Sequence, residues 1–333
     1  MGSYLVRRLA GTLPVLLLIS LLVFLLIHAA PGDPTLLLLG EETNAADVAR
    51  AKERWGLDRP LYVQYLKFLQ SAAVGDFGQS FKYTEPVMQV IMTRLPATIE
   101  LAVFAILIAT VLAIPLGVWA GSRPNSWIDN LGTTFGLFGI SMPSFWLAIM
   151  LILLLAGVLN ILPTSGRSTY GVAGPEQTGF YILDSILQKN WGAVWDALTH
   201  ILLPALALGV NMLGILMRVT RSAILEVMNE DYVQTARAKG LREKKVVWRH
   251  VTRNALIPVI TVVGLELGTL LSGSIIVETV FSWPGSGSLL ITALNARDYP
   301  LVTGLVMTYT AAFVSINLII DGLYAVIDPR IRY

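Results

Sequence analysis

The stretch that sets the organisation of this chain reads DYVQTARAKGLREKKVVWRHVTRNALIP, from Asp231 to Pro258. It is polar and basic and stands between two apolar segments, so we expect it in water while its neighbours lie in lipid. Asp231 has the chemistry of an N-cap and Gln234 follows three residues later, which predicts a short helix opened by a capping box. Gly240 predicts a left-handed stop after Lys239, with a second helix to follow. The pattern is typical of two helices joined by a tight turn, and residues 231–258 are here called the bracket.

The composition is that of a polytopic membrane protein. The chain has 333 residues, of which 55% are hydrophobic and 14% charged, and its mean hydropathy is +0.67. An ordinary soluble domain is less apolar. The net charge is only +2, and the basic residues gather at membrane edges, which argues against a nucleic-acid partner. The absence of cysteine excludes disulfide scaffolds and thiolate metal sites.

Six apolar runs predict six transmembrane helices in an all-α bundle, because each can cross the ~30 Å hydrocarbon core. The expected spans are residues 9–27, 98–121, 131–159, 201–217, 256–281 and 301–326. A cleaved signal peptide is the alternative for the first run, but that run is longer than the usual ~7–15 residues of a signal core. Prolines stand in or beside four spans, at Pro115, Pro143, Pro204 and Pro258, where each permits a kink.

The charges of the connecting segments predict the topology. Between Arg218 and Arg253 nine Lys or Arg stand against four acids, so the positive-inside rule predicts that this loop is cytoplasmic. Residues 31–96 carry eight acids and seven bases and lack that bias, so we expect them outside. With six spans, both termini are then cytoplasmic. Within the outer segment, amphipathic helices are expected at residues 45–55 and 61–69.

Motif searches point away from an enzyme. The chain contains no Gly-Lys dipeptide and therefore no Walker A loop, and G-x-S-x-G and H-E-x-x-H are also absent. His28, His200 and His250 lack metal-ligand spacing. We therefore expect no catalytic residue, no metal site and no cofactor in this chain.

One acidic residue, Glu266, stands in the middle of the fifth expected span. A carboxylate there is costly in lipid and usually faces a bundle interior or an aqueous path. Helical periodicity places Glu266 on a face with Thr269 and Gly273, which makes these residues candidates for lining a translocation pathway. The alternative is a structural carboxyl bonded to a neighbouring helix. Small residues suited to close helix packing repeat on a different face: Gly264, Gly268 and Ser272.

Two further acids, Glu100 and Glu278, stand nearer the ends of their expected spans. Capping or interfacial roles are the expectation for both, because the end of a span is closer to water than its middle.

The basic segment has two interpretations. Its charges could simply fix the topology, which explains their sign but not the helix pattern. Small residues at Thr235, Ala236 and Ala238, with Arg237 and Lys239 beside them, predict instead a low-profile docking helix that fits a partner's groove and offers cations to carboxylates.

At this point the sequence resembles a known family, the B-type permease subunits of dipeptide and oligopeptide importers of the ATP-binding-cassette class. The blocks that carry the resemblance are YVQTARAKG (232–240), RNALIP (253–258), HAAPGDP (28–34), GLDRPLYVQY (56–65), GDFGQSF (75–81), ETVFSWPGSG (278–287), RDYPLV (297–302) and DPRIRY (328–333). Gln234 and Thr235 stand where the family's signature is named for Glu and Ala. Members often carry an amide at the position of Glu266, so the resemblance does not imply a general pathway role for this carboxylate.

The resemblance implies a type I importer permease fold, one domain over residues 1–333, with a core bundle at 98–326 and a coupling loop at 218–255. It implies a bacterial inner-membrane location and four kinds of partner: a homologous C-type permease, two cytoplasmic ATPases that bind ATP and Mg, an extracytoplasmic binding protein, and a peptide cargo. The coupling residues it implies are Tyr232, Gln234, Thr235, Ala236, Arg237, Ala238, Lys239, Gly240 and Leu241. Asp231 and Pro258 frame that segment.

Other functions stay open at this stage. Nickel chelates, glutathione and opines are alternative cargoes for similar permeases. An ion-coupled secondary transporter would use Glu266 as its ion site, and a membrane hydrolase would need a nucleophile that no motif supplies.

Overall fold

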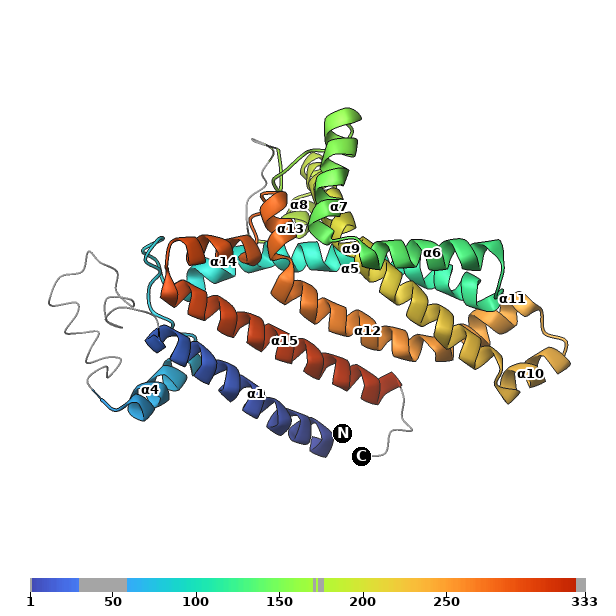
Figure 1. Cartoon of the computed structure of the whole chain (residues 1–333), viewed down its shortest axis with the longest axis horizontal. Helices are drawn as coiled ribbons and strands as arrows, with labels where there is room; N and C mark the ends of the chain where they lie inside the picture. Colours follow the sequence, from blue (N-terminus) through green and yellow to red (C-terminus); the bar gives the residue numbers. More distant parts are fainter. Residues whose placement is uncertain (1, 30–58, 170–171, 173–176, 328–333) are drawn as a thin grey trace.

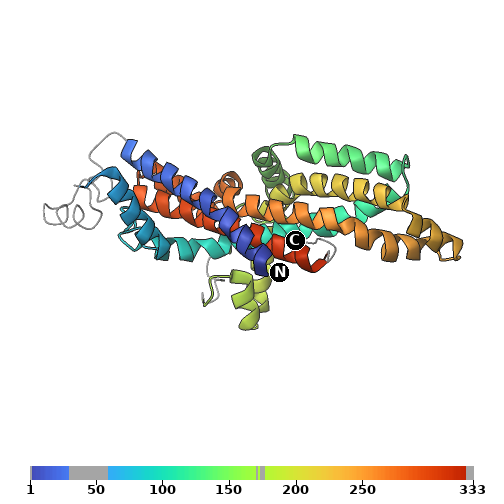
Figure 2. The same ribbon diagram turned by 90° about the horizontal axis from the view of Figure 1, so that it is seen from below.

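The computed structural model describes residues 2–29, 59–169, 172 and 177–327 of the chain. The surroundings of a few residues at helix ends, Ser272 and Gly273 among them, lie outside the description, as does the predicted helix at 45–55. The described residues form helices and loops with no strand, so the all-α prediction is confirmed. Figures 1 and 2 show an elongated bundle in which the long helices run roughly along one axis.

Two long helices form the centre of the bundle: α5 (Val87–Ser122) and α9 (Trp191–Met228). They pack along each other because α5 turns a row of buried alanines, from Ala97 to Ala120, toward its neighbours. Two glycines extend this close approach. A Cβ at Gly117 would lie 2.6 Å from the Thr220 Cβ, and one at Gly121 would lie 2.8 Å from the Ile224 Cβ. Small residues on α5 therefore set the spacing between the two helices.

The third expected span is broken, which corrects the prediction of one helix over 131–159. Helix α6 (Trp127–Ser141) packs on α9 and ends at Met142, whose backbone is extended. Helix α7 (Ser144–Leu151) then continues into a π-helical turn, Ile152–Val158, at 102° to α6. Pro143 explains the break, because it has no N–H for the helix ladder and disfavours helical backbone at Met142. In Figure 1, α7 projects away from the long helices.

The N-terminal and C-terminal helices lie side by side: α1 (Gly2–Ala29) and α15 (Tyr299–Ile327). Helix α4 (Leu61–Ala73), which confirms the helix predicted at 61–69, packs on α1. The Ser20 Oγ and the Tyr65 Oη are 2.8 Å apart, and the His28 Nε2 lies 2.9 Å from the Gln64 Oε1. Interhelical polar contacts of this kind hold the two helices together.

The fifth expected span ends earlier than predicted. Helix α12 (Thr252–Gly273) follows a short helix, α11 (Glu243–Lys245), and a π-helical turn, Val246–Val251. Ser274 interrupts the helix within the expected span, and two short helices, α13 (Ile275–Val280) and α14 (Ser286–Asn295), complete the region. The predicted close packing at Gly264 and Gly268 is formed between α12 and α15. Cβ atoms at these two glycines would clash with Ile320 and Phe313 of α15.

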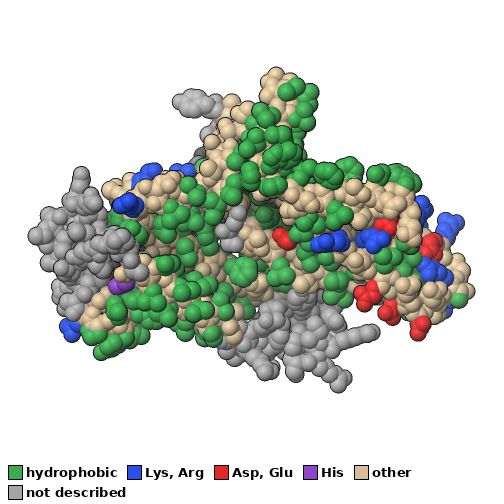
Figure 3. All heavy atoms as spheres, in the orientation of Figure 1, with side chains coloured by type: hydrophobic (Ala, Val, Ile, Leu, Met, Phe, Trp, Pro, Cys, Tyr) green, Lys and Arg blue, Asp and Glu red, His purple; other side chains and the backbone are tan. Residues whose placement is uncertain are grey.

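Six apolar helical segments occupy the places of the six expected spans. In the described residues, α5, α9, the helix over 243–271 and α15 are long and apolar enough to cross a membrane, and α6 with α7 makes a fifth, bent crossing. Helix α1 contributes a shorter apolar stretch, Gly11–Leu26. Figure 3 shows hydrophobic side chains over much of the visible face, whereas charged side chains gather at the end that carries α10 (Asp231–Ala238) and α11.

A buried carboxylate, Glu278, holds α13 and α14 against α5. It is fully buried and accepts hydrogen bonds from the hydroxyls of Thr98 (2.8 Å) and Ser274 (2.7 Å) and from the backbone N–H of Ser288 (2.9 Å). The nearby Trp283 indole donates to the Ala97 carbonyl at 2.9 Å. The expectation of an interfacial role for Glu278 is wrong, because its charge is compensated inside the protein by donors from three segments.

A second buried carboxylate, Glu100, fastens the loop before α8 (Tyr181–Leu187) to α5. The Arg167 guanidinium lies 2.6 Å from the Glu100 Oε2 and also donates to the Gly179 carbonyl at 2.8 Å. The backbone N–H of Ile182 donates to the other oxygen, Oε1, at 2.8 Å. The charge of Glu100 is thus neutralised by one arginine, and the loop is tied to the bundle.

Asp184, in the first turn of α8, holds the end of this loop. Burial alone would raise the pKa of Asp184, but hydrogen bonds from the hydroxyl and backbone N–H of Thr178 and from the backbone N–H of Gln177 outweigh burial and lower this pKa below its ordinary value.

Candidate functional site: the 231–258 bracket

The bracket begins with helix α10 (Asp231–Ala238), which lies directly after the end of α9. Glu230 occupies the N-cap position and its side chain makes no capping hydrogen bond, so the predicted capping box of Asp231 and Gln234 is wrong. Asp231 is instead the first residue of the helix, where a negative charge still interacts favourably with the helix dipole. The helix is therefore started by the turn after α9 rather than by a cap.

The end of α10 is built as the sequence predicts. Gly240 has φ +75°, in the left-handed region. Its N–H donates to the Arg237 carbonyl at 2.9 Å, and the N–H of Leu241 reaches back to the Ala236 carbonyl at 3.4 Å. These two bonds form a Schellman motif, which needs a residue that tolerates a positive φ. No heavy atom lies within 4 Å of the position of a Cβ on Gly240, so the requirement here is conformational and not steric.

One face of α10 packs into the protein and the other faces outward. Val233 and Ala236 are buried, whereas Tyr232, Gln234 and Thr235 are exposed, as are Ala238, Lys239 and Gly240. The expectation that Ala236 forms part of the docking surface is therefore wrong. Its small size instead allows α10 to approach the rest of the bracket closely, and Thr235 and Ala238 supply the low exposed surface.

The buried face of α10 belongs to a small apolar cluster, here called the bracket core. Its buried members are Val118, Ala223, Ile224, Val233, Ala236, Val246, Val247, Val251 and Ala255. They come from α5, α9, α10, the π-helical turn and α12. Since close-packed interiors transmit displacement, a push on α10 would act on the ends of three long helices together.

Polar contacts reinforce the bracket on its outer side. The Asn254 amide donates to the Tyr232 hydroxyl at 2.7 Å. The Arg237 guanidinium bonds both carboxylate oxygens of Glu243, at 2.8 and 3.2 Å. This hydrogen bonding raises the pKa of Arg237 and lowers the pKa of Glu243. Arg237 is therefore engaged within the chain, while the side chain of Lys239 makes no hydrogen bond or ion pair with any part of the chain that the structure describes. Of the two expected cations, Lys239 is the one available to a partner.

Pro258 and the three predicted pathway residues all lie on α12. Pro258 stays within the continuous helix and lines an open hollow together with residues of α9. Glu266 is half-buried, and among the described residues its carboxylate forms no hydrogen bond or ion pair. Thr269 is exposed and donates to the Leu265 carbonyl at 3.1 Å. Gly273 ends α12, and its surroundings lie outside the described residues. The structure does not bring these residues into one cluster with α10.

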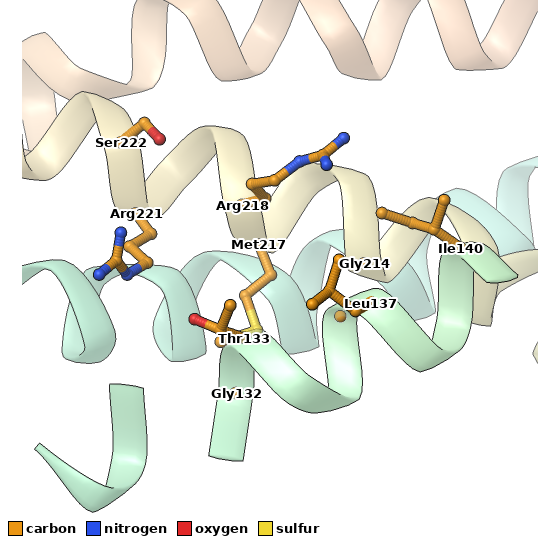
Figure 4. A pocket seen from close by; sticks show the side chains of 10 residues that line it. Gly132, Thr133, Leu137, Ile140, Gly214, Met217, Arg218, Arg221 and Ser222 are labelled. Atoms are coloured by element: carbon orange, nitrogen blue, oxygen red, sulfur yellow. The ribbon is translucent and has the colours of Figure 1, made fainter. Parts of the chain in front are cut away.

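A polar site on α9 was not predicted from the sequence. Arg218, Arg221 and Ser222 line a hollow of about 240 Å³ against α6, shown in Figure 4. Basic residues at the end of a span indicate topology, but their spacing of three to four residues on one helix face also indicates a lined surface. In the described part of the chain, no group of three or more His, Asp or Glu could hold a metal ion.

The sequence matches one family along nearly its whole length. Residues 113–333 match the family described as "Binding-protein-dependent transport system inner membrane component", and residues 1–102 match the N-terminal region of such membrane components. The chain belongs to this family. It is therefore a multi-pass inner-membrane permease of an ATP-binding-cassette importer, and ATP hydrolysis falls to partner subunits. The family also implies a partner permease and a substrate-binding protein.

Two relatives are similar to this permease in sequence, and one solved structure is similar to it in fold. The dipeptide transport system permease protein of Alkalihalophilus pseudofirmus is 41% identical over 333 residues, covering all of both chains. The glutathione transport system permease protein of Salmonella paratyphi A is 39% identical over 333 residues, again covering both chains. The MetNI methionine transporter, in inward-facing conformations, shares the fold with a TM-score of 0.51 at 16% identity, covering 72% of this permease and 97% of that chain. The predicted type I importer permease fold is thus confirmed.

Proposed function

We propose that this permease forms half of the translocation pathway of an importer for dipeptides or short peptides. The supporting observation is its full-length similarity to a dipeptide permease. A pathway of this kind is completed by a homologous C-type permease. Two cytoplasmic ATPases bind ATP and Mg, an extracytoplasmic binding protein delivers the peptide, and no cofactor is held by this chain itself.

A second cargo, glutathione, is favoured by one observation, the 39% identity to a glutathione permease. Glutathione is itself a short peptide derivative, so the two proposals differ in cargo and not in mechanism. The deciding experiment measures ATPase activity of the assembled transporter with its binding protein, with dipeptide or glutathione added. Stimulation by a dipeptide and not by glutathione supports the first proposal, and the reverse result replaces it with the second.

We propose that α10 is the coupling element between this permease and an ATPase, and that the whole chain, 1–333, acts as one domain with both termini in the cytoplasm. The bracket core carries the argument, because it joins α10 to the ends of α5, α9 and α12. ATP-driven closure of the ATPase dimer would displace α10, and the bracket core would pass that displacement to the pathway helices. The energy comes from the ATPase's different affinities for ATP in its two states.

The exposed face of α10 provides the test. Ala238→Trp and Thr235→Trp add bulk where a partner would seat, without entering the bracket core. We expect both variants to insert normally and to lose ATPase binding and transport. Arg123→Trp, at an exposed position in the loop after α5, is the matched control and should retain both. ATPase co-purification at wild-type levels with either α10 variant would show that α10 is not the docking element.

A further inference from the structure

The face of α9 between α6 and α12 forms a trough. One hollow, of about 240 Å³, lies against α6 at Gly136, and a second, of about 320 Å³, reaches Pro258 of α12. Both hollows include Arg218 and Ser222, so these two residues lie where the hollows meet. We define the α9 trough by Gly136, Gly214, Arg218, Ser222, Glu226 and Pro258.

The trough contains one arginine without a counter-ion. Arg221 is paired with the buried carboxylate of Asp129, to which its Nη2 donates at 2.8 Å. The side chain of Arg218 is exposed and forms no ion pair or hydrogen bond with any residue that the structure describes. In Figure 4 its side chain extends away from Arg221. Glu226 also lines the trough but lies two turns further along α9, about 12 Å along the helix axis. The guanidinium of Arg218 is thus free to bind an anion.

The polar character continues toward the middle of α9. Asn211 stands seven residues before Arg218 and therefore on the same face of the helix. Its side chain is half-buried and likewise lacks a hydrogen bond within the described chain. The outer face of α6, in contrast, exposes large apolar side chains such as Phe135 and Phe138, and the exposed hydroxyls of Thr134 and Ser141 donate to carbonyls of their own helix. Because charged and amide groups are costly against acyl chains, the α9 stripe belongs against water or a polar ligand, whereas the outer face of α6 suits lipid.

We propose that the α9 trough is the cytoplasmic half of the translocation pathway and that Arg218 contacts the carboxylate of the passing cargo. A guanidinium binds a carboxylate through two parallel hydrogen bonds, and every unmodified peptide ends in a carboxylate. The open, hydrated position of Arg218 keeps this contact weak enough for release, as a pathway requires. The cargo part of this inference rests on the proposed function as a peptide importer.

The absence of cysteine from the chain allows a direct test of the trough. In the assembled, nucleotide-free transporter carrying Ser222→Cys, anionic and cationic methanethiosulfonate reagents are compared for their labelling rates. The positive charge of Arg218 should favour the anionic reagent, and Arg218→Gln should lower the anionic-to-cationic rate ratio by roughly tenfold. Arg123→Gln removes a charge from the same end of the bundle outside the trough and should leave the ratio unchanged. The proposal is overturned if neither reagent labels the cysteine, which is the result expected if a lipid or another subunit fills the trough. It is also overturned if Arg218→Gln leaves the anionic-to-cationic rate ratio unchanged.

The cargo contact needs a second measurement. With saturating, cargo-loaded binding protein, Arg218→Gln should lower dipeptide transport in proteoliposomes by about tenfold while Arg218→Lys retains an intermediate rate. In the Ser222→Cys transporter that keeps Arg218, dipeptide should also slow the labelling of the introduced cysteine. Wild-type transport by Arg218→Gln overturns the role of Arg218. Failure of dipeptides to stimulate the wild-type ATPase would instead reject the peptide cargo, and the reagent ratio, measured without cargo, would still report on the trough.

Discussion

The left-handed residue that ends α10 gives a prediction whose size follows from the structure. Gly240 has φ +75° and open space around the position of a Cβ, so Gly240→Ala introduces no clash and its cost is purely conformational. An alanine in this region costs about 1–2 kcal/mol. That free energy favours opening of the turn by a factor of about 5–30. Asparagine tolerates the left-handed region better than alanine, so Gly240→Asn should have a smaller effect.

Hydrogen exchange in the assembled transporter measures this opening directly. The amides to follow are those of Lys239 and Leu241, which donate to carbonyls of α10 at 3.1 and 3.4 Å. We expect their exchange to accelerate most in Gly240→Ala, less in Gly240→Asn, and to be unchanged in α4, at the other end of the molecule. Cargo-stimulated ATPase activity should fall in the same order. Equal acceleration by Ala and Asn, or none by Ala, would refute the argument that a positive φ is what this position requires.

Three further predictions test the packing and the buried carboxylates. Gly121→Ala places a Cβ 2.8 Å from the Ile224 Cβ and should destabilise the protein by about 1–3 kcal/mol, seen as a lower thermal midpoint, whereas Gly11→Ala, with no heavy atom within 4 Å, should not. Glu278→Gln turns an amide NH₂ toward hydrogen-bond donors and should lower the free energy of unfolding by about 2–3 kcal/mol in the same assay. Glu266→Gln should change the free energy of unfolding by less than about 0.5 kcal/mol, because the Glu266 side chain has no hydrogen-bond partner among the described residues. Folding lowers the pKa of Asp184 below its ordinary value of 3.8. The ionised carboxylate therefore stabilises the fold at pH values above 3.8, and this stabilisation is lost as the pH falls below that value. Proteolysis of the loop before α8 should therefore increase below about pH 4, and Asp184→Asn should remove that dependence.

The helices were predictable from the sequence wherever one local rule was sufficient. Long apolar runs located the membrane segments, and Gly240 located the end of α10, because both depend on neighbouring residues alone. The break at Pro143 was harder to predict. Prolines at positions 115, 204 and 258 stay inside continuous helices, so the residue type permits a break without requiring one. Packing of the neighbouring helices decides between the two outcomes.

The buried carboxylates show where sequence reasoning fails. Glu278 stands near the end of an apolar run and looks interfacial, yet donors from Thr98 and Ser288 surround it. Those donors stand 180 residues before it and 10 after it in the chain, and no local pattern brings them together. Glu266, in contrast, attracts attention from its position in mid-span, although the described residues give it no partner. Depth along a span therefore says little about how a carboxylate is compensated.

The small residues of α10 show how this helix is joined to the rest of the permease. The sequence suggested that Thr235, Ala236 and Ala238 form one surface for a partner, but helical geometry separates them. Ala236 faces the bracket core with Val233, and the other two face outward. Small size thus serves two purposes, since it keeps the exposed face low and lets the buried face approach α5 and α12. Because Ala236 and the ends of those helices share one close-packed cluster, α10 cannot tilt independently of them. A partner that moves α10 must also move the adjoining ends of α5, α9 and α12.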